Sequence, residues 1–223
     1  MELNDATLQK DFSWEAFSSA LFRLNYLIGI SPILRHYIPI QIIASGGYVS
    51  LCALGNRTTT QDLDYFIDPV AYGSNLGLIQ NELHRIIRQV AREMHFVEDW
   101  ANDQVTLFLS LLRDPKDLFD RSVQQDVRLY SGNNLHIYGV LWLWVLVRKM
   151  KRLQMEGQPA READWSDCFY ILQRMFEDTG EPLRKYRLRE FDHTNREPPV
   201  FEETVNQLNQ LFREMRGFDG ITN

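Results

Sequence analysis

Two adjacent glycines, Gly46 and Gly47, constrain the fold of this chain more than any other feature. They follow residues 38–44, a short, isoleucine-rich apolar run that predicts a buried strand. A Ser-Gly-Gly sequence is typical of a tight turn and ends such a run. The apolar stretch 48–54 that comes next predicts a short helix. The sequence therefore predicts a strand that turns sharply into a helix.

A second strand is predicted at residues 62–67, after the polar loop 56–61. Side chains alternate between the two faces of a strand, so Asp62 and Asp64 are expected on one face and Leu63 in the core. Two neighbouring carboxylates repel each other, which raises a pKa or requires a counter-ion. Magnesium is a suitable counter-ion, because it binds one or two carboxylates together with substrate phosphates.

The glycine turn supplies the complementary half of such a site. Backbone N–H groups at Ser45, Gly46 and Gly47 can approach phosphate oxygens closely, and the N-terminus of the following helix favours negative charge. A phosphate cradle joined to a D-x-D pair predicts a site for a nucleoside triphosphate and magnesium. Simpler interpretations stay open: the glycines supply only the positive φ of a turn, and the two aspartates only cap a strand end.

These residues resemble the signature of the nucleotidyltransferase superfamily, in which a Gly-Gly turn and a short helix precede D-x-D on a strand. The pattern L-G-x-R-x-T-x-x-D-L-D at residues 54–64 is similar to small bacterial and fungal members related to toxin–antitoxin nucleotidyltransferases. The resemblance implies an α/β (α+β) fold with a minimal mixed sheet and flanking helices. It also implies magnesium-dependent transfer of a nucleoside monophosphate from a nucleoside triphosphate to an acceptor hydroxyl. In that scheme Asp62 and Asp64 hold the metal and are catalytic, and Arg57 offsets phosphate charge.

Superfamily enzymes usually carry a third carboxylate on a later strand, as a metal ligand or as the general base. Residues 100–103 resemble a W-x-N-D element of the same small families. The predicted strand 104–109 contains no carboxylate, so Asp103 just before it is the first candidate. Asp126, which opens a predicted strand at 126–130, is the second candidate.

The C-terminal part also resembles these families. A helix predicted at 140–154 ends in R-K-M-K-R, and a helix predicted at 159–176 contains D-x-x-D. The resemblance assigns Lys149 to the triphosphate. The other interpretation is a structural ion-pair network, because the two aspartates share a helix face and can pair with Lys149 or Arg152. The two aspartates are Asp164 and Asp167.

Hydrophobic periodicity completes the outline. We expect a nucleotidyltransferase-like core with N-terminal helices at residues 1–138 and a helical region at 139–223. The remaining predicted elements are helices at 12–27, 75–94, 116–124 and 201–215, and a hairpin of strands at 127–130 and 135–138.

Composition narrows the class of protein. The chain has 223 residues and a net charge of −6, which argues against unspecific coating of nucleic acid. The two cysteines, Cys52 and Cys168, lie in apolar surroundings, as expected of reduced thiols in an intracellular protein. Residues 1–10 are polar and do not resemble a signal peptide. No apolar run approaches the roughly 20 residues that span a bilayer. We therefore expect a cytoplasmic protein with no membrane partner.

Several assignments stay open. The acceptor could be RNA, a protein side chain or a small molecule, and nothing in the sequence indicates an oligomeric state. The chain could also be a catalytically inactive module that binds a nucleotide or another protein. A third possibility is a partner in a toxin–antitoxin-like pair.

Overall fold

The computed structural model describes residues 8–155, 162–191 and 198–223. The fold is of the mixed α+β class expected from the sequence. The chain divides into two compact units, Met1–Val140 and Leu141–Asn223, whereas the sequence placed the division after residue 138. Each unit is described separately below.

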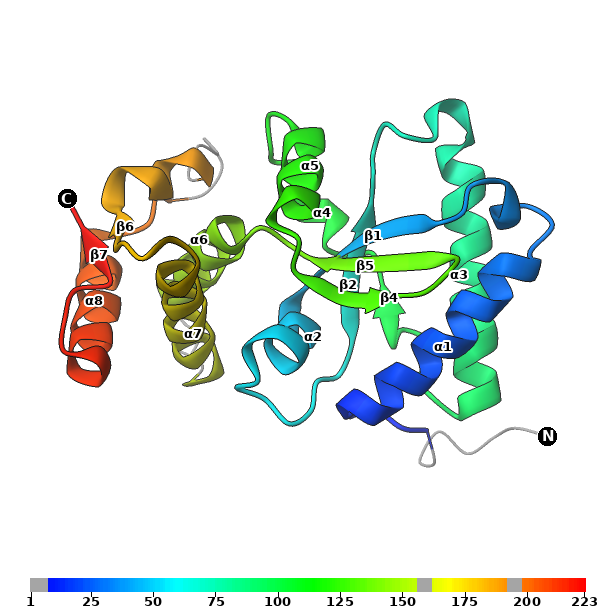
Figure 1. The fold of residues 1–223 in the computed structure, drawn as a ribbon, viewed down its shortest axis with the longest axis horizontal. Helices are drawn as coiled ribbons and strands as arrows, with labels where there is room; N and C mark the ends of the chain where they lie inside the picture. The colour runs from blue at the N-terminus through cyan, green and yellow to red at the C-terminus, as the bar shows by residue number, and fades with distance from the viewer. Residues whose placement is uncertain (1–7, 156–161, 192–197) are drawn as a thin grey trace. The chain divides into compact units, whose positions relative to one another are not determined.

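The described part of the first unit contains a mixed five-stranded sheet with the order β3-β2-β1-β5-β4 (Figure 1). Its central strand β1 pairs antiparallel with β2 and parallel with β5. Strand β3 pairs parallel with β2, and β4 pairs antiparallel with β5. The strands are β1 Ile40–Ser45, β2 Leu63–Ile67, β3 Ala101–Asn102, β4 Arg128–Ser131 and β5 Leu135–Gly139.

Helices α1 and α3 pack against each other beside this sheet (Figure 1). A helix was predicted at 12–27, and α1 begins at Trp14, because the Ser13 side chain accepts a hydrogen bond from the Ala16 N–H at 3.4 Å. The apolar face of α3 is buried, with Ile79, Leu83 and Val90 at 1% exposure or less. The α-helices of this unit are α1 Trp14–Ile30, α2 Gly46–Val49, α3 Leu76–Met94, α4 Thr106–Leu109 and α5 Pro115–Gln125, with 3-10 helices η2 Leu34–His36 and η4 Gly73–Asn75.

The prediction of a strand at 104–109 is wrong. The structure has the short helix α4 at Thr106–Leu109, preceded by the two-residue strand β3 that the sequence did not reveal. Polar side chains turn the backbone between them: the Asn102 Oδ1 accepts from the Gln104 N–H at 3.1 Å, and the Thr106 hydroxyl donates to the Asp103 carbonyl at 2.7 Å.

The second unit is mainly helical. Its elements are α6 Trp142–Leu153, α7 Glu162–Thr179, the 3-10 segment η5 Lys185–Phe191, α8 Glu202–Arg216, and a parallel pair of strands, β6 Leu183–Arg184 and β7 Ile221–Thr222. Leu146, Leu208 and Phe212 are among its fully buried residues. Residues 159–161 of the predicted helix 159–176 lie outside the described residues. Within the described ranges, every helix is too short or too polar to span a bilayer.

Candidate functional site

The turn Ser45-Gly46-Gly47, called the glycine corner below, lies next to Asp64 of the D-x-D pair. Strand β1 ends at Ser45, which lies opposite Asp64 in the antiparallel register of β1 and β2. Gly46 follows with a φ of +70°, a conformation that side chains other than glycine rarely adopt. A Cβ atom placed on Gly46 would lie 2.6 Å from the Asp64 Oδ2. The Asp64 carboxylate therefore lies against the bare backbone of the corner.

The loop that carries Arg57 is held against the same corner. A Cβ atom on Gly47 would lie 2.1 Å from the Thr60 Oγ1 and 3.2 Å from the Arg57 Nη1. Thr60 is anchored in turn by two backbone hydrogen bonds with Phe12, at 2.8 and 3.1 Å. A guanidinium group and a glycine backbone thus lie side by side, as an anion site requires.

Asp62 occupies the residue just before β2 and has a neutral hydrogen-bond partner. The Asn102 amide bonds to the Asp62 carboxylate, and Asn102 is also the register partner of Asp64 in the β2–β3 pair. Asn102 is therefore a neighbour of both aspartates. Burial raises the pKa of Asp62 most strongly, the nearby Asp99 carboxylate raises it further, and the Asn102 hydrogen bond opposes them. Together these effects raise the pKa of Asp62.

The helix that leaves the corner is irregular. Helix α2 continues as a π-helical turn, Ser50–Leu54, which ends at Gly55 with a φ of +66°. Such turns occur frequently at functional sites. Among the described residues, the Ser45 side chain makes no capping hydrogen bond to the first turn of α2. The first backbone N–H groups of the helix are therefore not capped by Ser45.

The structure does not bring Asp103 together with Asp62 and Asp64. Asp103 lines a cavity with Tyr65, whose side chain points to the opposite face of β2 from that of Asp64. Its Oδ2 lies 3.2 Å from the Nε2 of His84 on α3. The position in register with Asp64 belongs to Asn102 instead. Asp103 follows Asn102 by one residue, and successive side chains of an extended chain point to opposite faces.

The second candidate is also remote from the pair. Asp126 caps the C-terminus of α5 with a φ of 55°, and its Oδ1 bonds to the Arg128 Nε at 2.7 Å. It precedes β4, at the far edge of the sheet from β3. The carboxylate that does act on Asp62 is Asp99, which sequence reasoning missed. Its signal was its position three residues before Asn102 in the same acidic run.

The donor set at the corner suits magnesium. Carboxylate oxygens are the ligands that magnesium prefers, and it needs only one or two of them when phosphates supply the rest. Asp62 and Asp64 are the residues that could hold it. No group of three or more His, Cys, Asp or Glu side chains with metal-binding geometry occurs in the part of the chain that the structure describes. A metal here would depend on a phosphate ligand to complete its coordination.

Lys149 belongs to an ion-pair network inside the second unit. Its Nζ lies 2.5 Å from the Asp167 Oδ2 and 3.6 Å from the Asp164 Oδ1. The Arg152 Nε donates to the Asp164 Oδ2 at 2.9 Å. Both aspartates are almost fully buried, as the structural interpretation of the D-x-x-D sequence expected. Contact of Lys149 with a triphosphate stays a prediction.

No family model, curated protein or solved structure matches this chain. The resemblance to nucleotidyltransferases therefore stays a prediction based on residues 45–64, and the functional argument depends on the geometry of the corner.

Proposed function

We propose that this protein is a magnesium-dependent nucleotidyltransferase that transfers a nucleoside monophosphate from a nucleoside triphosphate to an acceptor hydroxyl. The observation that supports this most strongly is the close approach of Gly46 to Asp64, where a Cβ would lie 2.6 Å from the carboxylate oxygen. A polyphosphate bound by the corner N–H groups would lie beside the carboxylate that holds its metal. Neither the N–H groups nor the carboxylates alone would make a site for a polyphosphate with its metal.

Each residue at the corner has a distinct task in the proposed reaction. Asp62 and Asp64 hold the metal, and the N–H groups of Gly46 and Gly47 orient the phosphates. Arg57, which lies beside Gly47, offsets phosphate charge and favours departure of pyrophosphate. When bound, magnesium supplies charge neutralisation at the reacting phosphate.

The raised pKa of Asp62 gives the site a pH dependence. Metal ligation requires the ionised carboxylate, so binding releases the proton that burial favours. We therefore expect magnesium affinity to increase as the pH rises through the pKa of Asp62.

The second candidate function is binding without catalysis: a silent module that binds a nucleoside triphosphate with magnesium. Asn102 favours it, because this amide occupies the position in register with Asp64 where a third carboxylate would act as base. An amide cannot accept the proton of an attacking hydroxyl. Such a module would bind without turnover and could serve as one half of a two-protein system.

Calorimetry with each nucleoside triphosphate, in magnesium and in EDTA, tests both candidates. We expect magnesium-dependent binding that is lost in Asp64→Asn and retained in Asp126→Asn, a control at the far edge of the sheet. Release of pyrophosphate with RNA, protein or small hydroxyl acceptors then identifies transfer. Binding without pyrophosphate release supports the silent module, and absence of binding contradicts both candidates.

A further inference from the structure

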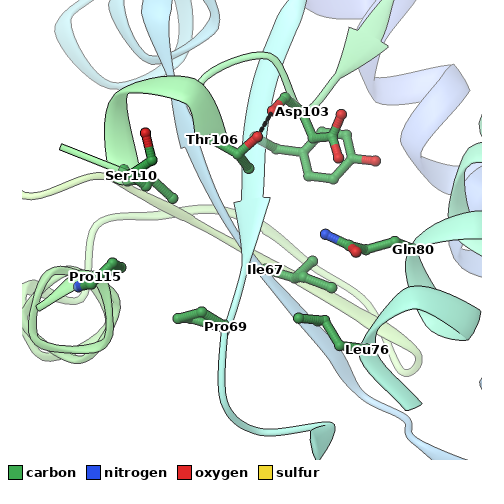
Figure 2. Close-up of a pocket in the computed structure, with 10 residues that line it drawn as sticks. Ile67, Pro69, Leu76, Gln80, Asp103, Thr106, Ser110 and Pro115 are labelled. Atoms are coloured by element: carbon green, nitrogen blue, oxygen red, sulfur yellow. Dashed lines mark hydrogen bonds between the residues drawn. The ribbon is translucent and has the colours of Figure 1, made fainter. Parts of the chain in front are cut away.

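Figure 2 shows a cavity in the first unit. It is lined by Tyr65 and Ile67 of β2, whose side chains lie on the opposite strand face from that of Asp64. Its volume is about 260 Å³. Ile67 of β2 and Leu76 of α3 form part of an apolar wall, and Asp103, Thr106 and Gln80 bring polar groups to it. A small apolar cavity with a few polar groups is the usual form of a binding site for a small molecule.

One polar atom of this cavity lacks a partner. Tyr65 lines the cavity and is 2% exposed, and its hydroxyl oxygen has no hydrogen-bond partner among the described residues. Buried hydroxyl groups in folded proteins are almost always paired, because an unpaired one loses its hydration without compensation. This oxygen is almost inaccessible, so a ligand in the cavity reaches it only when a lining side chain shifts slightly, and it would then supply the missing partner.

The charges around the cavity select the class of ligand. Asp103 is the only ionisable lining residue besides Tyr65 in the described part of the chain, and no lysine, arginine or histidine lines the cavity. His84 approaches Asp103 from α3, and the Asp103 side chain stays 31% exposed. This environment repels anions and favours a cation that donates hydrogen bonds.

We propose that this cavity binds a small amine, whose protonated nitrogen donates to the Tyr65 hydroxyl and the Asp103 carboxylate. The apolar body of the amine contacts Ile67 and Leu76. The inference is independent of the proposed nucleotide site, because the two sites lie on opposite faces of β2. A nucleotide, with its negative phosphates, is excluded from this cavity by the same carboxylate.

The probe is benzylamine, with benzyl alcohol as the neutral analogue and benzoate as the anionic one. Ligand-observed NMR titrations of the full chain at pH 7 measure the three dissociation constants. We expect benzylamine to bind at least tenfold more tightly than benzoate, because the Asp103 carboxylate attracts the ammonium group and repels the benzoate carboxylate. Benzyl alcohol should lie between them.

Matched variants locate the binding. We expect Tyr65→Phe, which removes only the hydroxyl, to weaken benzylamine binding about fivefold, and Asp103→Asn to weaken it about tenfold. Tyr130→Phe on β4 and Asp126→Asn should leave binding unchanged. If Tyr65→Phe fails to fold, as circular dichroism would show, Asp103→Asn decides alone. Absence of benzylamine binding, equal binding of benzoate, or unchanged affinity in Asp103→Asn would overturn the proposal.

Discussion

The chain contains two pairs of aspartates in opposite electrostatic situations. In the second unit, Asp164 and Asp167 are 2% and 0% exposed and face Lys149 and Arg152. In the first unit, burial and a neighbouring carboxylate raise the pKa of Asp62, whose hydrogen-bond partner is a neutral amide. Both pairs could be found by spacing alone, as D-x-x-D on a helix and D-x-D on a strand.

This difference distinguishes a structural pair of aspartates from a candidate functional pair. Buried carboxylates that meet lysine and arginine are already neutralised, so they hold α6 and α7 together and need nothing more. Asp62 retains an electrostatic cost that an external cation would relieve. Perturbed acids of this kind concentrate at functional sites. The comparison yields four predictions.

The largest effect is expected from Lys149→Met. Removing this ammonium leaves Asp167 buried without its nearest cation, which should reduce the free energy of unfolding by about 3–5 kcal/mol. Urea denaturation measures the loss. Arg174→Met, which breaks an exposed pair with Asp178, is the control and should cost less than about 1 kcal/mol. A loss below about 1 kcal/mol for Lys149→Met would show that the network is not structural.

Gly46→Ala should destabilise the first unit by about 2 kcal/mol, because alanine is strained at a φ of +70° and its Cβ would displace the Asp64 carboxylate. Binding of a nucleoside triphosphate with magnesium should be lost as well. The control is Gly77→Ala in the first turn of α3, where a Cβ meets nothing within 4 Å. That variant should gain up to about 1 kcal/mol. Equal effects of both variants in urea denaturation would refute the close approach.

Asn102→Asp adds a third carboxylate beside Asp62 and Asp64. Repulsion among the acids should lower the free energy of unfolding by about 1 kcal/mol in EDTA, and magnesium should restore it. If the silent module describes the natural chain, this variant should also gain pyrophosphate release. Asn206→Asp, on an exposed face of α8, is the control. Thermal melts that show no rescue by magnesium would argue against a metal at the pair.

The smallest effect is expected from Asp62→Asn, which keeps the shape of the side chain and removes its charge. Because the folded pKa of Asp62 exceeds the unfolded value of 3.8, the folded state binds more protons between the two values, so stability falls as the pH rises through them. Asparagine does not ionise, so the variant does not lose this stability. At pH 7 it should melt a few degrees higher than the natural chain, roughly 2–4 °C for each kcal/mol.

The gain from Asp62→Asn should vanish as the pH falls below about 4. Asp178→Asn, at an exposed pair, should change little at either pH. A higher melting temperature of the natural chain at pH 7 would contradict the raised pKa.

Much of the first unit could be predicted because its signals are local. The strand, the Ser-Gly-Gly turn, the helix and D-x-D all lie within residues 38–67, and the antiparallel register then places Ser45 opposite Asp64. The N-cap Ser13 of α1 and the apolar periodicity of α3 are likewise local signals that indicate a helix. These features need no knowledge of distant contacts.

The third acidic position could not be predicted in the same way. Strand β3 has only two residues, Ala101–Asn102, so it leaves no alternation that a pattern could detect. The apolar run 104–109 resembles a strand more strongly, yet side-chain hydrogen bonds from Asn102 and Thr106 turn it into a helix. With the strand misplaced, Asp103 became the first candidate for the third carboxylate, although Asn102 is the residue in register with Asp64.

Strand β2 separates two surfaces of opposite chemistry by the thickness of a single backbone. Asp64 faces the glycines, and the next residue, Tyr65, faces the amine cavity on the reverse. Inserting or deleting one residue ahead of Leu63 would swap them, placing an acid among the apolar side chains and a phenol beside the glycines. The length of the loop before β2 is therefore under a double constraint, and both surfaces would be lost together.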